Sequence, residues 1–279
     1  MILLAESGAT KTDWFAVSGD GMHRSCRTVG INPMLMCLEQ IREIAAIAVP
    51  AVNPEGERID KVFFYGAGIV SPYTSALIEE ALDPWCPFAE MECRSDLEAA
   101  ARALFGNERG VAAISGTGSN SCLCECGEII GNIRPGGFIL GDEGGAAAVG
   151  RMLMADFIKG LVPEPFMSVL ERDFALDYES VVRKVYKGDA PSGFLASFAP
   201  FVVENSSEPY FRGLLERNFR SFIERSLLRY GCNKVAVVGS FAYACRQMLT
   251  DLGKEYGLDF VKFLKEPISE LVKYHCHGI

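Results

Sequence analysis

The sequence predicts an α/β protein of two domains that face each other across a cleft, and three observations support this prediction. The chain has 279 residues, 49% of them hydrophobic, which is enough apolar surface for folded cores. Strand-like and helix-like periodicities alternate along it. One order of elements, three strands followed by alternating helices and strands, occurs twice. We place the boundary near 106–110, which gives domains 1–108 and 109–279.

The first half starts with three strands and then alternates helices with strands. The strands are expected at 2–5, 14–17 and 23–29, with a Gly-Asp-Gly turn at 19–21. A helix over 35–49 follows, because its apolar residues recur on one face. The remaining elements are a strand at 62–65, a helix at 75–82, a strand at 88–93 and a helix at 97–104.

The second half repeats this order and adds an insertion. A strand at 111–114 precedes two strands, 121–126 and 129–133, that pair as a hairpin about Gly127, and a helix is expected over 143–159. Residues 160–208, broken by four prolines, predict an insertion of short helices. The rest comprises a helix at 210–230, a strand at 235–238, a helix at 241–256, a strand at 260–263 and a last helix after Pro267, which can pack back on the first domain.

Charge and composition narrow the functional classes. A net charge of -9 argues against a nucleic-acid partner. The N-terminus lacks a signal-peptide pattern, and no apolar stretch approaches the roughly 20 residues of a membrane span, so we expect a cytoplasmic protein. Three histidines leave little material for a Ser-His-Asp triad. We therefore expect chemistry based on carboxylates, backbone amides and a bound metal.

Three glycine-containing loops follow predicted strands. The loop 6–12 (ESGATKT) can aim backbone N–H groups, hydroxyls and the Lys11 ammonium group at a phosphate, although alone it also fits an ordinary polar hairpin. The loop 115–120 (SGTGSN) occupies the equivalent place in the second half. Gly239 and Ser240 open a helix, which suits a nucleotide but also an ordinary strand-to-helix turn.

Two carboxylate positions complete the candidate site. Asp96 ends a strand where a helix begins, so it is either a reactive carboxylate or a helix N-cap, a role that Ser95 can also fill. Asp142 and Glu143 lie in GGFILGDEGG, where the glycines let the backbone approach a polar ligand.

The segments AESGATKTDW, SGTGSNS, GGFILGDEGG and VVGSFA, in this order and spacing, resemble the sugar kinase-like ATPases of the actin and hexokinase superfamily. The chain is most similar to the BadF/BadG/BcrA/BcrD-type branch, which includes N-acetylglucosamine kinases. The resemblance covers residue 2 to about 249. It implies two ribonuclease H-like (actin-like ATPase) domains, with ATP and Mg²⁺ as cofactors, a sugar substrate and a possible homodimer.

The resemblance also implies roles for single residues. Asp96 matches the general base of the sugar kinases, and Glu6 matches a carboxylate that holds hydrated Mg²⁺. The ATP-binding positions are Gly8, Thr10, Lys11, Thr12, Gly116, Thr117, Gly118, Gly239 and Ser240. The positions that hold the amino sugar are Asn32, Thr117, Asn120, Asp142 and Glu143.

The sequence departs from the family at three points. Glu6 replaces the usual Asp, which adds a methylene to the metal-holding side chain. The loop between Gly137 and Gly141 is shorter than in the animal enzymes, and Gly145 replaces the more usual Ser. We expect an amino-sugar kinase that phosphorylates the 6-hydroxyl of N-acetylglucosamine.

Two alternatives remain open at the level of sequence. Members of the same branch are ATPase activators that carry an iron–sulfur cluster, which directs attention to Cys122, Cys124 and Cys126. Their alternation places all three thiols on one face of a strand, and the spacing matches no usual cluster motif. The second alternative is a sensor of sugar and ATP without turnover, against which Asp96 argues.

Overall fold

The computed structural model describes residues 1–8, 10–18 and 23–276. The chain divides into two compact units. Unit 1 comprises Met1–Glu108, Cys126–Glu128 and the segment from Glu266, whereas unit 2 comprises Arg109–Glu125 and Ile129–Lys265. The turn expected at 19–21 lies outside the described residues. No helix within the described part of the chain combines the length and apolar character of a membrane span.

Unit 1 is built on a five-stranded sheet in the order β3-β2-β1-β4-β5. β1 runs antiparallel to β2 and parallel to β4, and β4 runs parallel to β5. Its strands are β1 (Ile2–Ser7), β2 (Lys11–Val17), β3 (His23–Val29), β4 (Lys61–Gly66) and β5 (Glu90–Ser95). Its helices are α1 (Leu38–Val52), α2 (Pro72–Leu82), α3 (Asp96–Phe105) and α13 (Ile268–Cys276).

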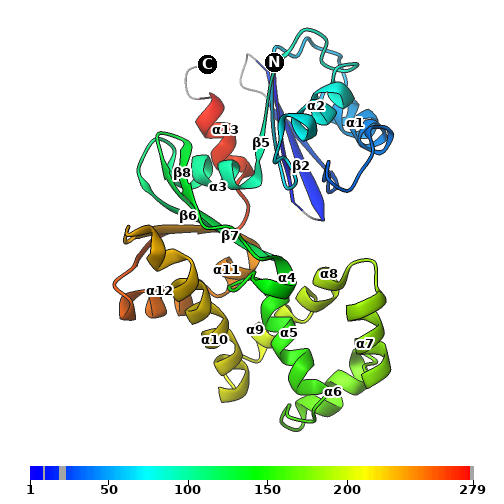
Figure 1. Ribbon diagram of the computed structural model, residues 1–279. Coiled ribbons are helices and arrows are strands. Elements are labelled where there is room, and N and C mark those ends of the chain that lie inside the picture. Colours follow the sequence, from blue (N-terminus) through cyan, green and yellow to red (C-terminus); the bar gives the residue numbers. More distant parts are fainter. Residues whose placement is uncertain (9, 19–22, 277–279) are drawn as a thin grey trace. The chain divides into compact units, whose positions relative to one another are not determined.

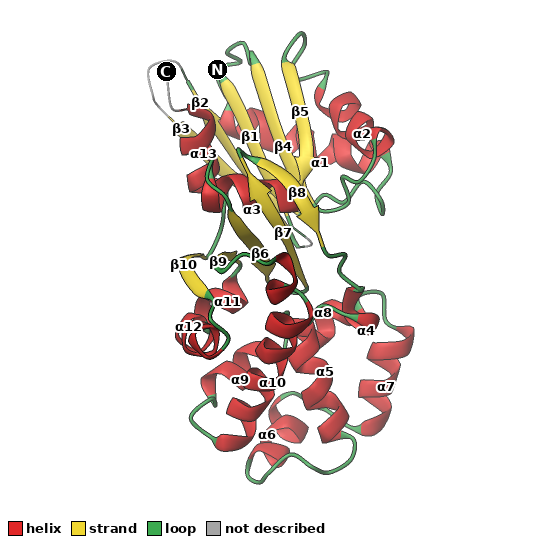
Figure 2. Cartoon of the chain, turned by 60° about the vertical axis from the view of Figure 1, so that its left-hand side comes forward, coloured by secondary structure: helices red, strands yellow, loops and turns green. Residues whose placement is uncertain are grey.

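Alternation along the strands gives this sheet two covered faces. Leu3 and Ala5 on β1 belong to one core together with Ile41 of α1 and Ile78 of α2. Figure 2 shows α1 and α2 on one side of the strands and α3 with α13 on the other. The last helix, α13, packs against α3, β1 and β2. The carboxyl ends of β1, β4 and β5 therefore lie at one edge of a sheet that is supported from both sides.

Unit 2 repeats the topology with β10-β9-β6-β7-β8, and β6 is again antiparallel to one neighbour and parallel to the other. Its strands are β6 (Gly110–Ser115), β7 (Ser119–Glu125), β8 (Glu128–Asn132), β9 (Lys234–Val238) and β10 (Asp259–Leu264). The larger helices are α5 (Ala146–Phe157), α10 (Pro209–Arg225), α11 (Ser240–Ala244) and α12 (Arg246–Glu255). The repeated strand order confirms the prediction of two related α/β units.

The segment 160–208 forms four short helices (Figure 1), the last two of which pack against α5 and the last also against α10. They are α6 (Phe166–Asp173), α7 (Tyr178–Lys187), α8 (Pro191–Ala196) and α9 (Ala199–Glu204). Edge-to-face contacts hold them, for example Phe166 against Phe211, with ring centroids 4.8 Å apart. These contacts let a segment rich in proline form a continuous core with unit 2.

Several helix boundaries differ from the prediction for local reasons. α1 begins at Leu38 instead of residue 35, because the N–H groups of Leu35 and Met36 donate to the carbonyl of Asn32 and form a turn. The helix expected at 241–256 is two helices, since Cys245 departs from helical geometry with φ −97° and ψ 12°.

Two further boundaries depart from the prediction in unit 2. The helix expected at 210–230 ends at Arg225 and continues as the 3-10 helix η1 (Leu227–Tyr230). α5 begins at Ala146 instead of residue 143, and the short helix α4 (Gly137–Leu140) was not predicted.

Candidate functional site

In unit 1, the turn between β1 and β2 carries the predicted phosphate-binding residues. The N–H of Gly8 donates to the carbonyl of Lys11 at 2.9 Å, which closes the turn. Thr10 is exposed within it, and Lys11 begins β2 with its side chain about one-third exposed. Thr10 is therefore accessible to an anionic ligand, and Lys11 is partly exposed beside it.

The Lys11 ammonium group lies in a group of charges that the sequence analysis missed. It pairs with Asp13 at 3.1 Å and with Glu266, and Arg27 pairs with the same two carboxylates at 2.6 and 3.2 Å. Partial burial lowers the pKa of Lys11, but hydrogen bonds to Glu266 and Asp13 outweigh it and raise the pKa overall. The alternation of β2 places Lys11 and Asp13 on one face, a signal available in the sequence, whereas Glu266 is 255 residues away.

Thr12 does not fit its predicted role. Its side chain is buried, and its hydroxyl donates to the carbonyl of Val29 at 3.0 Å and lies 2.8 Å from the Ser7 hydroxyl. Ser7 in turn donates to the carbonyl of Ile31 and accepts from its N–H. These bonds satisfy the Thr12 hydroxyl inside the sheet, so Thr12 supports the loop and does not offer a hydroxyl to phosphate.

Glu6 lies on β1 opposite Asp13 of β2. Burial and the nearby carboxylates of Asp13, Asp96 and Glu266 raise the pKa of Glu6 to about 7, against the opposing effect of Lys11. The described residues hold no group of three His, Cys, Asp or Glu side chains that could coordinate a metal directly. A crowded carboxylate whose charge is poorly compensated instead fits a hydrated Mg²⁺ that other ligands also hold.

Asp96 is the first residue of α3, and Ser95 is the N-cap. The Ser95 hydroxyl accepts from the N–H of Glu98 at 3.2 Å, while the Glu98 carboxylate accepts from the N–H of Ser95 at 3.0 Å. Burial raises the pKa of Asp96. Hydrogen bonds from the backbone N–H groups of Leu97 and of Asp96 itself oppose this rise, and Ser95, not Asp96, is the N-cap of the helix.

Glu6 and Asp96 meet at one edge of the sheet because of strand register. Ser7 aligns with Gly66 of β4, and Gly66 aligns with Ser95 of β5. The ends of β1 and β5 therefore lie level, with one strand between them. Unit 1 thus brings together Glu6, Lys11 and Asp96, while Asn32, which follows β3, accepts from the N–H of Met34 through its side chain at 3.0 Å.

In unit 2, the loop 115–120 is held against the segment 142–147. The hydroxyls of Ser115 and Ser119 donate to the carbonyls of Gly144 and Glu143, both at 2.6 Å. The first N–H groups of α5 donate to the carbonyls of Gly116 and Thr117, both at 2.9 Å. These bonds join two of the predicted motifs into one rigid loop pair.

Asp142 lies against Gly118 and has an unusual backbone conformation, with φ 54°. A Cβ atom on Gly118 would lie 2.5 Å from Oδ2 of Asp142, so any other residue at position 118 would displace this carboxylate. Burial raises the pKa of Asp142, opposed by hydrogen bonds from the backbone of Ser119 and Gly137. The carboxylate is thereby fixed beside the SGTGSN loop.

Two other predicted sugar contacts, Glu143 and Asn120, already have partners within unit 2. Glu143 pairs with Arg225 at 2.5 Å. The Asn120 side chain accepts from the N–H of Ser121 at 2.9 Å and from the Asn132 side chain at 3.2 Å. A sugar would have to share Glu143 and Asn120 with these partners.

Gly239 brings the third motif to the same place. It has φ 132°, and a Cβ atom on it would lie 2.1 Å from the carbonyl oxygen of Ser115. Ser240 is the first residue of α11 and is exposed. The close approach at Gly239 explains why this turn needs glycine, and it puts the turn beside the start of the SGTGSN loop.

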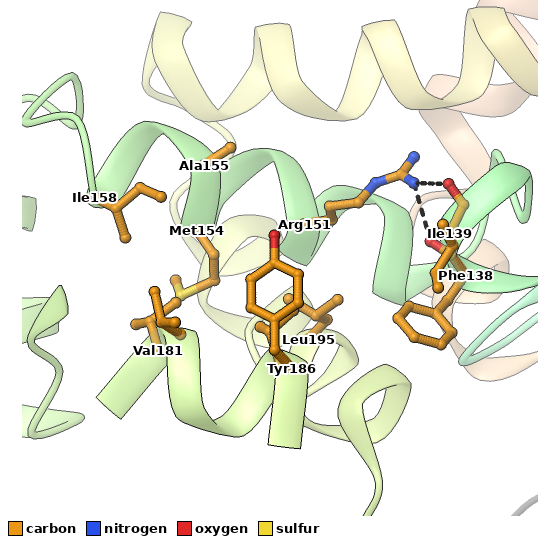
Figure 3. A pocket seen from close by; sticks show the side chains of 11 residues that line it. Phe138, Ile139, Arg151, Met154, Ala155, Ile158, Val181, Tyr186 and Leu195 are labelled. Atoms are coloured by element: carbon orange, nitrogen blue, oxygen red, sulfur yellow. Dashed lines mark hydrogen bonds between the residues drawn. The ribbon is translucent and has the colours of Figure 1, made fainter. Parts of the chain in front are cut away.

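A cavity of about 310 Å³ lies between α5, α7, α8 and α4, the helix formed by part of the GGFILGDEGG segment (Figure 3). Its lining is mostly apolar, with Met154, Val181 and Leu195 among the residues shown. Arg151 on α5 donates to the carbonyls of Phe138 and Ile139 at 3.0 and 2.6 Å. Arg151, which the sequence analysis did not single out, therefore anchors α4 next to Asp142.

The cysteines differ from the predicted arrangement. Cys122 and Cys124 are buried on β7, but Cys126 lies beyond the end of the strand, is exposed and has φ 52°. Cys126 also belongs to unit 1, whereas the other two belong to unit 2. The prediction that all three thiols share one strand face is therefore wrong, because β7 ends at Glu125.

Comparison with solved structures reveals full-length similarity. A protein from Porphyromonas gingivalis, named "Putative N-acetylglucosamine Kinase", is 36% identical, with a TM-score of 0.94 over 100% of this chain and 99% of that chain. A "Putative N-acetylglucosamine Kinase" from Chromobacterium violaceum is 17% identical, with a TM-score of 0.76 over 98% of both chains. A glucokinase from Balamuthia mandrillaris is 11% identical, with a TM-score of 0.54 over 98% of this chain and 91% of that chain.

The last two similarities show a common fold. No protein-family model matches the sequence, and no curated protein does.

Proposed function

The chain belongs to the N-acetylglucosamine kinase-like branch of the BadF/BadG/BcrA/BcrD-type ATPases and is therefore a phosphotransferase with an alcohol group as acceptor. We propose that it phosphorylates the 6-hydroxyl of N-acetylglucosamine with ATP. The observation that carries this proposal is the buried Asp96 carboxyl group, which is not needed as the N-cap of α3 because Ser95 fills that position. It lies at the same sheet edge as Glu6, and Lys11 is close enough to Glu6 to affect its pKa. A base, a metal-holding carboxylate and a cation are the parts that phosphoryl transfer to a hydroxyl requires.

We assign the role of general base to Asp96. The carboxylate accepts the proton of the sugar hydroxyl while the hydroxyl oxygen attacks the γ-phosphorus atom of ATP and ADP leaves. A carboxylate whose pKa is raised by burial is a stronger base than an ordinary Asp, and this supports the assignment. Transfer of the γ-phosphoryl group to water instead of to the sugar is limited when the reacting groups are enclosed.

We assign phosphate binding to Gly8, Thr10 and Lys11 in unit 1 and to the backbone of Gly116, Thr117 and Gly118 in unit 2. Lys11 supplies charge, and glycine backbones allow close approach to phosphate oxygens. Gly239 and Ser240 would border the adenosine. Glu6 would hold Mg²⁺ through water, and the ion would supply charge neutralisation on the β- and γ-phosphates.

We assign sugar recognition to Asn32, Thr117, Asn120, Asp142 and Glu143. The fixed position of Asp142 beside Gly118 supports its role, because a rigid acceptor selects a hydroxyl at one place on a sugar ring. Asn120 and Glu143 would bind the sugar while keeping or exchanging their partners Asn132 and Arg225.

A coupled assay of ADP release tests the proposal. Purified protein is given Mg²⁺ and ATP with a panel of hexoses and N-acetylhexosamines. We expect the highest kcat/KM for N-acetylglucosamine and little ADP release without sugar. A preference for a hexose without the acetamido group would remove the substrate assignment but leave a sugar kinase, whereas sugar-independent ADP release would remove both.

A further inference from the structure

Glu266 lies where the chain enters unit 1 from unit 2. β10 ends at Leu264, and α13 begins at Ile268. The N–H groups of Glu270 and Leu271 donate to the carbonyl of Pro267 at 3.0 and 3.1 Å, so Glu266 immediately precedes the first helical hydrogen bonds. Ile268 and Leu271 are buried, which anchors the start of this helix and thereby the position of Glu266.

The Glu266 carboxylate accepts a hydrogen bond from the ammonium group of Lys11, the residue to which phosphate binding is assigned above. Phosphate oxygens and carboxylate oxygens satisfy an ammonium group in the same way, through charge and accepted hydrogen bonds. The contact therefore fills the position on Lys11 that an anionic ligand needs.

Of the two carboxylates on Lys11, Glu266 is the one that can move away. The Asp13 side chain is about one-tenth exposed, lies within β2 and pairs with Arg27 at 2.6 Å. The Glu266 side chain is about one-third exposed and lies outside any helix or strand. Arg27 is 3.2 Å from Glu266, so it can keep a partner on this carboxylate after Lys11 turns to a ligand.

We propose that Glu266 acts as an internal substitute for a nucleotide phosphate on Lys11, so that a binding nucleotide displaces it and Glu266 sets the affinity for nucleotide. This inference rests on the proposed function, because it uses the phosphate role of Lys11. Glu266 is a positioning residue here and contacts neither sugar nor nucleotide. Its carboxylate opposes nucleotide binding by competition and by repulsion of the phosphates.

The test measures dissociation constants by equilibrium dialysis without sugar, for ATP and ADP with Mg²⁺ and for adenosine. Glu266→Gln keeps the shape and removes the charge. We expect about three- to tenfold tighter binding of ATP and ADP, the scale of a partly exposed ion pair. Adenosine, which has no phosphate, should bind unchanged. Glu80→Gln, which breaks the surface pair with Arg42 in the same unit, is the matched control and should change none of the three constants.

Further variants separate competition at Lys11 from a general change of charge or of folding. In Lys11→Met protein, adding Glu266→Gln should no longer tighten ATP binding. Glu266→Asp, which keeps the charge, should remain within about twofold of the wild-type constant. Glu266→Ala, which also removes the charge, should tighten ATP binding as Glu266→Gln does and covers the case in which Glu266→Gln does not fold.

Unchanged or weaker ATP binding in Glu266→Gln overturns the inference, as does an equal gain in the Lys11→Met background. So does a gain for ATP in Glu266→Asp as large as that expected for Glu266→Gln. Any of these results alongside normal sugar-dependent ADP release by the wild type leaves the proposed function intact. Failure of the wild type to bind ATP overturns both.

Discussion

The side chain of Asn218 on α10 holds the backbone of Gly144: its Oδ1 atom accepts the Gly144 N–H at 2.8 Å, and its Nδ2 atom donates to the carbonyl of Gly145 at 3.1 Å. Asn218 is buried, with 3% of its surface exposed. One amide thus fixes both glycines that follow Asp142 and Glu143. The geometry of the segment that carries Asp142 and Glu143, two of the predicted sugar contacts, therefore depends on a residue more than 70 positions later in the chain.

Replacing Asn218 tests this dependence. We expect Asn218→Leu to lower the free energy of unfolding by about 2–4 kcal/mol, because two buried backbone groups lose their partner. Urea denaturation measures the loss. The exposed Asn233 provides the control, and Asn233→Ala should change stability by less than about 0.5 kcal/mol. Equal effects of the two substitutions would contradict the role given to Asn218.

Substitutions at Thr12 and Thr10 should distinguish a residue that supports the loop from one that binds the nucleotide. Thr12→Val removes a buried hydroxyl at nearly constant shape, so we expect a loss of about 1–2 kcal/mol in unfolding free energy and an unchanged KM for ATP. Thr10→Val, at an exposed position in the phosphate loop, should raise the KM for ATP with little change in stability. The reverse pattern would restore Thr12 to the nucleotide site.

The raised pKa of Glu6 makes stability depend on pH. Its folded-state pKa of about 7 exceeds the ordinary value of 4.5, so the folded protein binds this proton more tightly than the unfolded chain does. The resulting stabilisation is present below pH 4.5 and is lost as pH rises through about 7. In buffer without divalent metal, Glu6→Gln should therefore have a higher Tm than the wild type at pH 8 and a similar Tm at pH 5.

The exposed Glu57 supplies a control for the Glu6 experiment. Glu57→Gln should shift the Tm by the same small amount at both pH values. A Glu6→Gln shift that does not change with pH would mean that Glu6 does not titrate in this range.

The Asp96 assignment predicts a loss of rate without a loss of binding. Asp96→Asn should lower kcat by about 10²-fold or more, the scale of general-base catalysis, while the dissociation constant for ATP changes little. Ser95→Ala removes the N-cap and should lower stability by about 1 kcal/mol without a comparable fall in kcat. If the two variants lose activity equally, Asp96 acts through the helix start and not on the substrate.

Local signals predicted most of the fold, and the exceptions have physical causes. The strand at 23–29 was predicted with the ends that the structure has, His23 and Val29. The break at Cys245 was missed because the apolar spacing continues through it. α4 was missed because its four residues are too short for a periodic pattern.

Local sequence signals also predicted part of the candidate site, and contacts between distant segments account for the rest. Glycine loops after strands directed attention to Lys11, Gly118 and Gly239. The pairing of β6 with β9 then explains why the loops of Gly118 and Gly239 lie side by side in unit 2. Glu266 and Asn218 could not be predicted, because their contacts join segments that are distant in sequence. Tertiary packing alone brings these side chains to the loops.

The most direct test of the central claim is the identity of the product. The protein is incubated with N-acetylglucosamine, ATP and Mg²⁺, and the mixture is followed by ³¹P NMR with proton–phosphorus correlation. We predict one phosphate ester, coupled to the two protons on carbon 6, that grows in step with ADP and does not form at a comparable rate with Asp96→Asn. Inorganic phosphate in place of an ester, or an ester on another carbon, would contradict the account.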